Sequence, residues 1–288
     1  MAAVLEALGD TRRSRPPSRA RALSLRALRY VVADSNNHAL RAVAFADGEG
    51  ADGAGAVSTI AGTGEIGARN GPGARATLNA PFGVAAAADG TVYFTEGGGH
   101  RVRKVRPDGV VLLVAGKGTA GLENGPKAHC TFSAPHGLAL DPRTLDDADG
   151  PELVVADTNN HVVRAVRANT GETRTLAGKG HAGFKDGKAA RAQFAGPSDV
   201  AVAPCGHIFV ADMFNHRVRV IGPDGASVRT LAGTADAGAA DGAADGAARL
   251  DHPNCLALDV ARGVLYVTEM KGQAVRAIDV SSVLNPAA

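Results

Sequence analysis

The sequence predicts an all-β fold of repeated four-stranded sheets, and three observations support this prediction. An acidic residue ends a short apolar run five times, and an arginine follows each acid after seven positions. The intervals between successive acids are 62, 61, 55 and 57 residues, which leaves room for four short strands and a loop. Apolar residues recur six and nine positions after each acid, on opposite faces of one strand. Because sheets stacked around an axis cover both faces, we expect a β-propeller.

The acid and the arginine are expected to form one structural pair in each repeat. The pairs are Asp34 and Arg41, Glu96 and Arg103, Asp157 and Arg164, Asp212 and Arg219, and Glu269 and Arg276. Each arginine shares a strand face with an apolar residue, so we expect it to lie partly buried between blades with the acid as its partner. The fivefold recurrence of the pair indicates a structural role and argues against catalysis.

The third repeat shows the expected order of elements. Strands are expected over residues 137–141, 153–157, 162–166 and 173–177, separated by turn-prone residues. The connection between the second and third strands contains Asn and His, which is typical of a tight turn. After the fourth strand come Ala-Gly, then Asn-Gly or Asp-Gly, an apolar residue and a proline. We interpret this segment as a loop that the apolar side chain pins before the chain returns to the next blade.

The hairpins resemble a known repeat. Residues 100–105, 160–166 and 215–221 resemble the NHL repeat, which is named for Asn-His-Leu, and the resemblance covers about residues 22–280. The strand ending in Ala-Asp, the Asn-His turn, the arginine and the Ala-Gly to Asp-Gly loop recur in the same order. The resemblance implies an NHL-type β-propeller, which usually has six blades. The long loops are similar to those of plant and algal NHL modules.

The last repeat departs from this pattern. Lys271, Gly272 and Gln273 replace the Asn-His turn, and only twelve residues follow Arg276. Little room is left for a fourth strand. We expect five blades of which the last is incomplete, or a six-bladed propeller that is truncated. In a further alternative, the N-terminal segment completes the last sheet by pairing with it.

Charge divides the chain into two expected parts. Residues 1–29 carry seven arginines and two acids, a net charge of +5, which leaves −3 for the rest of a chain whose total is +2. We expect residues 1–21 to be a basic, disordered segment and residues 22–288 to form the propeller. The arginine-rich start also resembles an organelle transit peptide. The sequence thus predicts an intracellular protein without a membrane segment. If the arginine-rich start is a transit peptide, the protein is expected in an organelle.

Sequence motifs for catalysis have structural explanations here. Gly-x-Gly-x-x-Gly occurs three times at the repeat period, without the helix that a dinucleotide site needs. The histidines four positions after the acids fit turns better than a metal site, because zinc ligands must converge at about 2.0–2.1 Å. Motifs of zinc proteases, serine hydrolases and phosphate-binding loops do not occur. We therefore expect no catalytic residue, metal or cofactor.

The expected function is a non-enzymatic interaction scaffold that binds a protein partner through its hairpin turns. The predicted binding residues are Asn36, Asn37, His38, Asn159, Asn160, His161, Phe214, Asn215 and His216. The alternative is a propeller enzyme, a lyase or hydrolase with a metal in its central channel. A third hypothesis is RNA binding, which the net charge of −3 outside residues 1–29 disfavours.

Overall fold

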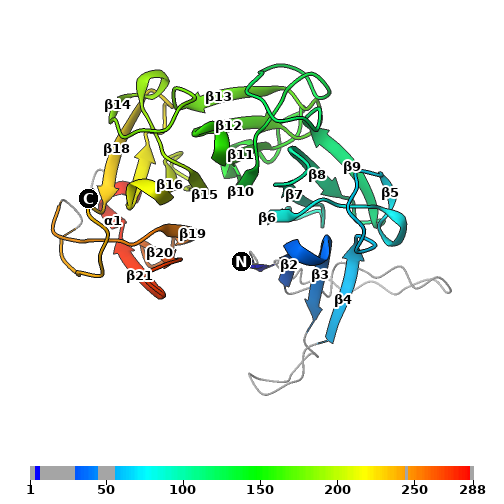
Figure 1. Ribbon diagram of the computed structural model, residues 1–288, viewed down its shortest axis with the longest axis horizontal. Coiled ribbons are helices and arrows are strands. Elements are labelled where there is room, and N and C mark those ends of the chain that lie inside the picture. Colours follow the sequence, from blue (N-terminus) through cyan, green and yellow to red (C-terminus); the bar gives the residue numbers. More distant parts are fainter. Residues whose placement is uncertain (1–3, 7–29, 45–55, 244–245, 286–288) are drawn as a thin grey trace. The chain divides into compact units, whose positions relative to one another are not determined.

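The chain folds into small antiparallel sheets, the blades of a β-propeller, which confirms the predicted fold class (Figure 1). The computed structural model describes residues 4–6, 30–44, 56–243 and 246–285. In this part of the chain there are five sheets, divided between two compact units, residues 1–113 and 114–288. No helix of the described segments is long and apolar enough to cross a bilayer.

The first unit contains two blades. The first sheet has the order β1 (Val4–Glu6), β2 (Tyr30–Asp34), β3 (Ala39–Ala44), β4 (Ala56–Ala61). The second has the order β5 (Gly71–Pro72), β9 (Val110–Ala115), β8 (Arg101–Val105), β7 (Val92–Glu96), β6 (Pro81–Ala86), and its strand β9 ends just beyond the unit boundary. Strand β1 pairs with β2, so these three residues belong to the first sheet and not to the last. The rest of the predicted segment 1–21 lies outside the described residues.

The second unit contains three blades. One sheet consists of β10 (Pro135–Leu140), β11 (Glu152–Asp157), β12 (Val162–Arg167) and β13 (Thr173–Ala177). The next has the order β14 (Gly187–Lys188), β18 (Ser227–Ala232), β17 (Arg217–Ile221), β16 (Ile208–Asp212), β15 (Pro197–Val202). The last has three strands among the described residues, β19 (Pro253–Asp259), β20 (Val264–Glu269) and β21 (Ala274–Asp279), and the helix α1 (Ser281–Leu284) follows it. Among the described residues the last blade thus has no fourth strand, which agrees with the expectation from its sequence.

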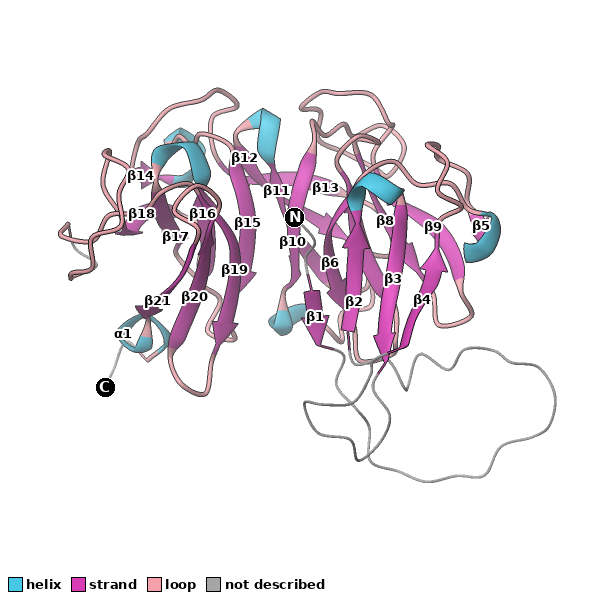
Figure 2. Ribbon diagram, turned by 60° about the horizontal axis from the view of Figure 1, so that its bottom comes forward, coloured by secondary structure: helices cyan, strands magenta, loops and turns pink. Residues whose placement is uncertain are grey.

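Short 3₁₀ helices lie in six of the connections between strands. They are η2 (Ser35–Asn37), η3 (Gly73–Arg75), η4 (Pro142–Thr144), η5 (Thr158–Asn160), η6 (Ala189–Arg191) and η7 (Met213–Asn215). Three of them, η2, η5 and η7, connect the second and third strands of a blade, and Figure 2 draws such helical turns in cyan at the ends of the strands.

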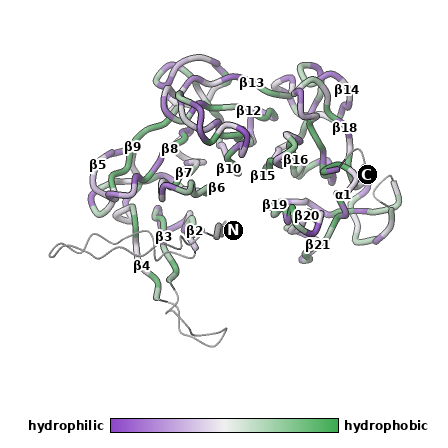
Figure 3. The backbone as a smooth tube through the Cα atoms, turned by 180° about the vertical axis from the view of Figure 1, so that it is seen from behind, coloured by the Kyte–Doolittle hydropathy of each residue, from purple (hydrophilic) through white to green (hydrophobic). Residues whose placement is uncertain are grey.

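Apolar side chains fill the space between neighbouring blades within each unit. Figure 3 shows hydrophobic stretches in green along strands such as β9 and β18. In the second unit, Val154 and Val163 of one blade share a buried cluster with Val210 of the next. Phe194, the apolar residue of the connecting loop, is fully buried in the same cluster. Strands that are apolar on both faces therefore have a neighbour on each face, which explains why alternation of polar and apolar residues is weak in this sequence.

The long loop of each repeat adds backbone pairing to the following blade. Strand β5 pairs with β9, and β14 pairs with β18, each as a fifth, outermost strand. In the blade between them, the loop residue Gly125 bridges Thr173 of β13 in the same way. A blade is thus completed at its outer edge by the repeat that precedes it.

Candidate functional site

The acid and arginine pairs of the three middle repeats are buried ion pairs. Arg103 lies 2.7 Å from Glu96, Arg164 lies 2.9 Å from Asp157, and Arg219 lies 2.7 Å from Asp212. None of these six side chains is more than 1% exposed. Each pair joins the end of the second strand to the middle of the third strand of its own blade.

Each buried arginine also binds the loop that arrives from the preceding repeat. Arg164 donates to the carbonyl oxygens of Glu123 and Thr131, at 2.9 and 3.1 Å, and to Asn124 Oδ1 at 2.8 Å. The side chains that correspond to Asn124 in the other repeats bind their arginines as well: they are Asn70, Asp186 and Asp241. From the sequence, this Asn-Gly or Asp-Gly position is interpreted only as part of the loop. Its polar side chain recurs eight residues after the glycine of Ala-Gly in each of the four loops, and this recurrence was the available signal for a third partner.

The pairs of the first and last repeats are more open. Arg41 is 34% exposed, and its Nε lies 3.1 Å from Asp34. Arg276 lies 3.4 Å from Glu269, compared with 2.7–2.9 Å in the middle repeats. The last sheet lacks a fourth strand in the described part of the chain, so fewer atoms cover its arginine.

Burial changes the acidity of the paired carboxyl groups. It raises the pKa of Asp157 to about 6, although Asn160, the N–H of Ser133 and Arg164 all stabilise the carboxylate. Burial also raises the pKa of Glu96 and of Asp212 above the usual range. The hydrogen bonds of these carboxyl groups come from protein groups, which is the arrangement of a structural ion pair, although Glu96 Oε2 is buried without a hydrogen-bond partner among the described residues.

The repeat histidines connect neighbouring blades. His38, His161 and His216 close their 3₁₀ turns in the left-handed conformation, with φ of 49°, 57° and 54°. The Nδ1 atom of His161 accepts a hydrogen bond of 3.0 Å from the N–H of Gly196, just before the first strand of the next blade. His38 accepts one from Ala80 at 3.0 Å, and His216 accepts one from His252 at 3.3 Å. Each of these three rings therefore has a structural contact that needs a neutral imidazole.

The asparagine before each of these histidines is also engaged inside the protein. The side-chain amides of Asn37, Asn160 and Asn215 donate to the acid of their own repeat, at 2.8–3.1 Å. Asn160 and Asn215 donate in addition to loop carbonyls, those of Gly121 and Gly183. Of the nine predicted binding residues, four are exposed: Asn36, Asn37, Asn159 and Phe214.

Exposed apolar side chains gather at the turns of the last two blades. Phe214 is 54% exposed, and Met270, in the turn between β20 and β21, is 44% exposed. His252 lies between them: its ring is 6.0 Å from that of Phe214, and its carbonyl oxygen accepts the N–H of Met270 at 2.9 Å. The ring of His216 is 4.6 Å from that of His252. We call Phe214, His216, His252 and Met270 the turn patch; the sequence analysis missed His252 and Met270.

One group of metal-ligating residue types lies within the turn patch. In the part of the chain that is described, His216, Asp251 and His252 place one potential ligand atom each within 4.8 Å of one another. Asp251 Oδ1 is 2.6 Å from His252 Nδ1 and 3.8 Å from His216 Nδ1. The Nδ1 atom of His216 is also the acceptor for the N–H of His252. A metal ion here would compete with these hydrogen bonds.

The first strands of the second unit carry a second polar group that the sequence analysis did not single out. Asp199 in β15 and Cys255 in β19 occupy the position of Gly137 in β10. Asp199 accepts the N–H of Leu256 at 2.8 Å and that of Val200 at 2.9 Å. Burial raises the pKa of Asp199 to about 7, and burial together with Asp199 raises the pKa of Cys255 to about 11. The thiol is therefore neutral at physiological pH and a poor nucleophile.

Comparison with known proteins agrees with this description. The NHL repeat family matches residues 194–221. The chain is 32% identical over 264 residues to "Protein SUPPRESSOR OF QUENCHING 1, chloroplastic" from Arabidopsis thaliana. The aligned region covers 87% of this chain and 24% of that protein. It is 25% identical over 285 residues to NHL repeat-containing protein 2 from Homo sapiens. This aligned region covers 87% of this chain and 37% of that protein. The chain thus spans 24% and 37% of the lengths of these two relatives.

Solved structures with the same fold are more distant in sequence. An auxiliary nutrient binding protein from Bacteroides ovatus has a TM-score of 0.62 at 17% identity, over 86% of this chain and 56% of that chain. A chain of a nidogen/laminin complex has a TM-score of 0.57 at 16% identity, over 88% of this chain and 72% of that chain. At these identities the likeness concerns the fold alone. The repeat motif, the blades and the relatives together show that the chain belongs to the NHL-repeat β-propeller proteins.

Proposed function

We propose that the chain is a non-enzymatic scaffold that binds a protein partner through the turn patch. The supporting observation is that Phe214 and Met270 are both exposed and both contact His252, which lies between them. Aromatic and methionine side chains are enriched in protein interfaces, and a few such residues contribute most of the binding energy. The Phe214 ring packs on Gly196 and on the ring of His252 and is still 54% exposed, so its outer face is available to a partner.

The surrounding turn is suited to rigid presentation of these side chains. The N–H of Phe214 donates to the carbonyl oxygen of Ala195 at 3.0 Å, and Asn215 is bonded to Asp212 and to Gly183. These contacts fix the backbone before a partner arrives. Little conformational entropy is then lost in the turn when it binds.

The experiment compares variants of the patch with a matched control elsewhere in the last blade. The full chain, the double variant Phe214→Ala/Met270→Ala and the control Val260→Ala serve as baits in extracts of the source organism. Val260 is 48% exposed and follows β19, at the other end of β20 from Met270. Proteins that the full chain and the control retain, and that the double variant loses, are then purified. Their affinities for the three baits are measured by calorimetry.

The proposal expects the double variant to bind such a partner at least about 30-fold more weakly, the loss typical of interface hot spots. The control should retain the affinity of the full chain. Equal affinity of the full chain and the double variant would show that the turn patch is not the binding surface. Circular dichroism of all three baits checks that each is folded.

A further inference from the structure

Two adjacent residues before the last blade depart from the repeat pattern. In four blades, two residues precede the proline that begins the first strand: they are Asn79 and Ala80, Ser133 and Ala134, Ala195 and Gly196, and Asp251 and His252. The second residue of each pair has a positive φ, between 47° and 60°. Alanine or glycine is therefore sufficient for this turn, and the backbone conformation does not require the imidazole of His252.

The histidine of the preceding turn faces this pair. Asp251 Oδ1 lies 2.6 Å from His252 Nδ1 and 3.8 Å from His216 Nδ1. One ligand atom of each residue lies within 4.8 Å of those of the other two. Two ligand atoms of a tetrahedral zinc ion are about 3.3 Å apart, since each bond to the metal is about 2.0–2.1 Å long. The two measured distances lie on either side of this value, so small side-chain rotations bring the three groups around one ion.

The backbone that carries the pair is fixed, and the side chains remain accessible. The N–H of Asp251 donates to Glu269 Oε1 at 2.6 Å, and the carbonyl oxygen of His252 accepts the N–H of Met270 at 2.9 Å. The side chains of His216, Asp251 and His252 are 17%, 26% and 13% exposed. A small ion can therefore reach ligand atoms that the fold already holds close together.

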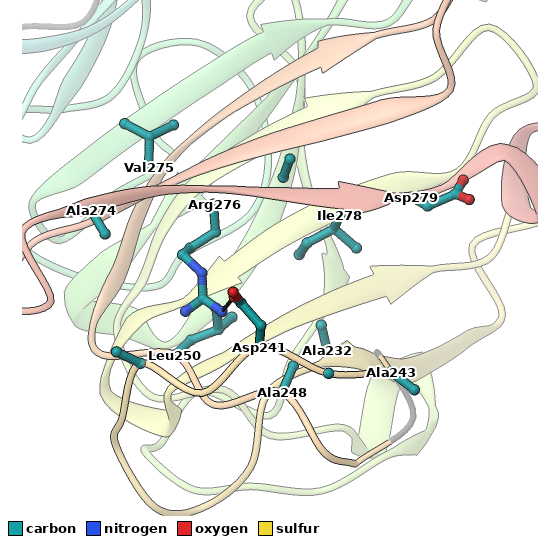
Figure 4. Close-up of a pocket in the computed structure, with 13 residues that line it drawn as sticks. Ala232, Asp241, Ala243, Ala248, Leu250, Ala274, Val275, Arg276, Ile278 and Asp279 are labelled. Atoms are coloured by element: carbon teal, nitrogen blue, oxygen red, sulfur yellow. Dashed lines mark hydrogen bonds and ion pairs between the residues drawn. The ribbon is translucent and has the colours of Figure 1, made fainter.

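The carboxylate of Asp251 has no arginine or lysine partner within the described segments. Its ion pairs there are with the imidazoles of His216 and His252. The cavity of about 800 Å³ beside β21 is different, because Figure 4 shows Asp241, in its wall, paired with Arg276. The negative charge of Asp251 is thus left for a cation that the two imidazoles can also bind.

We propose that His216, Asp251 and His252 bind a zinc ion beside the turns of the last two blades. Two imidazole nitrogens and one carboxylate oxygen are typical zinc ligands, whereas calcium and magnesium prefer oxygen ligands alone. Three protein ligands leave the fourth position to a water molecule. His216 ends a turn, but the other two ligands come from the connection to β19, so the spacing of the turn histidines does not predict the site.

Metal binding replaces two hydrogen bonds among these groups. Nδ1 of His252 exchanges its contact with Asp251 for the metal, and the proton of the neutral ring is then on Nε2. Nδ1 of His216 exchanges the N–H of His252, which lies 3.3 Å away, for the metal. The equivalent contacts of His38 and His161 are shorter, at 3.0 Å, so zinc replaces the weakest contact of the three.

The test uses the untagged, metal-free protein of 288 residues and zinc chloride. Calorimetry gives the stoichiometry and the dissociation constant, and cobalt(II) replaces zinc for absorption spectroscopy. The variants are Asp251→Asn and His252→Ala. They introduce the residues that precede β6 at the same positions, Asn79 and Ala80, so both are compatible with the repeat.

The control variant is His207→Ala. It removes a different close pair of potential metal ligands, because His207 Nδ1 lies 3.3 Å from Cys205 Sγ. All variants retain Phe214 and Met270, and the zinc measurements need no protein partner. The metal site can therefore fail while the proposed protein binding holds, and the reverse.

The expected result is one zinc ion per chain and a higher melting temperature in the presence of zinc. Asp251→Asn and His252→Ala should each weaken zinc binding by about 100-fold or more, because even groups that only orient metal ligands are worth about 10–100-fold. His207→Ala should bind zinc like the unchanged protein. Cobalt bound to the unchanged protein should give the strong visible absorption of a four-coordinate site.

Three results would overturn the proposal. They are the absence of saturable binding at millimolar zinc, equal zinc affinity of the unchanged protein and both site variants, and the weak visible absorption of six-coordinate cobalt. Circular dichroism checks that the variants are folded. If a variant does not fold, the cobalt spectrum of the unchanged protein decides between a site and no site.

Discussion

The buried guanidinium groups determine how residues of different repeats are held together. Arg164 has four partners: one carboxylate, one side-chain amide and two backbone carbonyl oxygens. At an effective dielectric constant near 20, two charges 4 Å apart attract each other by about 4 kcal/mol, and desolvation offsets much of this energy. The arrangement therefore specifies the position of the loop more than it adds net stability. Removing one partner is costly, because the other charge stays buried.

Replacing one buried arginine should reveal this asymmetry. We expect Arg164→Ala to lower the free energy of unfolding by about 3–5 kcal/mol, because the carboxylate of Asp157 is left buried without its cation. Arg106→Ala removes the arginine of an exposed pair with Asp108 and should cost less than about 1 kcal/mol. Urea denaturation followed by circular dichroism measures both. Similar losses for the two variants would show that burial does not determine the strength of the pair.

The sequence predicts the acid and arginine pair better than it predicts the arginine's other partners. Asp157 and Arg164 lie on neighbouring strands of a tight hairpin, so their separation of seven residues suffices to bring them together. Asn124 precedes Arg164 by 40 residues, and its position depends on how the loop packs on the blade. The spacing of residues along the sequence does not predict how the loop packs on the blade. The exposure of Met270 and its contact with His252 likewise depend on the tertiary structure.

The 3₁₀ turns are the elements that form hydrogen bonds to the next blade. Thr158 at the start of η5 donates to the carbonyl oxygen of Pro197 at 2.8 Å, and His161 at its end accepts from Gly196. Burial lowers the pKa of His161, which keeps its imidazole neutral and able to accept. A proton on Nδ1 would replace this acceptor with a donor that faces another donor.

Two substitutions at His161 separate the acceptor from the ring. Asparagine can place an oxygen near the position of Nδ1 and tolerates the left-handed conformation, so His161→Asn should cost less than about 1 kcal/mol. His161→Phe retains a ring without an acceptor and should cost about 1–3 kcal/mol, because the N–H of Gly196 loses its partner. Urea denaturation at pH 7.5 measures both. If His161→Asn were as destabilising as His161→Phe, the hydrogen bond would not be the stabilising contact.

The pH dependence of these variants has a definite sign. The lowered pKa of His161 means that the unfolded chain binds a proton more readily than the folded one. The contribution of this group to stability is therefore complete above the ordinary pKa of 6.5 and is lost as the pH falls below it. His161→Asn should remove that part of the acid sensitivity. An unchanged slope below pH 6.5 would contradict this expectation.

At the level of elements, the sequence predicts the strands of a blade and misses the pairing of its loops. The expected strands 153–157 and 173–177 match β11 and β13 to within one residue. By contrast, β5 and β14 have only two residues each, Gly-Pro and Gly-Lys, which have no strand pattern. They are strands because the outer edge of the next blade offers them backbone partners. The neighbouring blade, and not their composition, determines their conformation.

On the scale of the molecule, Asp199 joins all three blades of the second unit. It belongs to β15, accepts the N–H of Leu256 in β19 and covers Gly137 in β10, where a Cβ atom would lie 1.9 Å from its Oδ1. Its pKa of about 7 exceeds the ordinary 3.8, so the folded protein binds a proton that the unfolded chain has released. The resulting stability is present at low pH and is lost as the pH rises toward about 7.

Asp199→Asn should change how stability varies with pH. The variant cannot titrate at this position, so its free energy of unfolding should rise relative to that of the unchanged protein between pH 5 and pH 8. Urea denaturation at unit intervals of pH measures this difference. Cys255 does not interfere, because burial keeps its thiol protonated over this range. A constant difference between the two proteins would show that the carboxyl group is equally acidic in the folded and unfolded states.

Each loop contacts the arginine of the repeat that follows it, so the stability of a blade depends on the repeat before it more than on the repeat after it. If the loop of residues 183–194 detaches, Arg219 loses the carbonyl oxygens of Lys185 and Gln193, and the blade that follows is weakened. If the loop of residues 238–250 detaches, the partners of Arg219 stay in place, and Arg276 is the arginine that loses contacts. Damage at one loop is therefore transmitted toward the C-terminus more readily than toward the N-terminus. This dependence runs in the direction of synthesis, because the loop that pairs with the outer strand of the second, third or fourth blade is made before that blade.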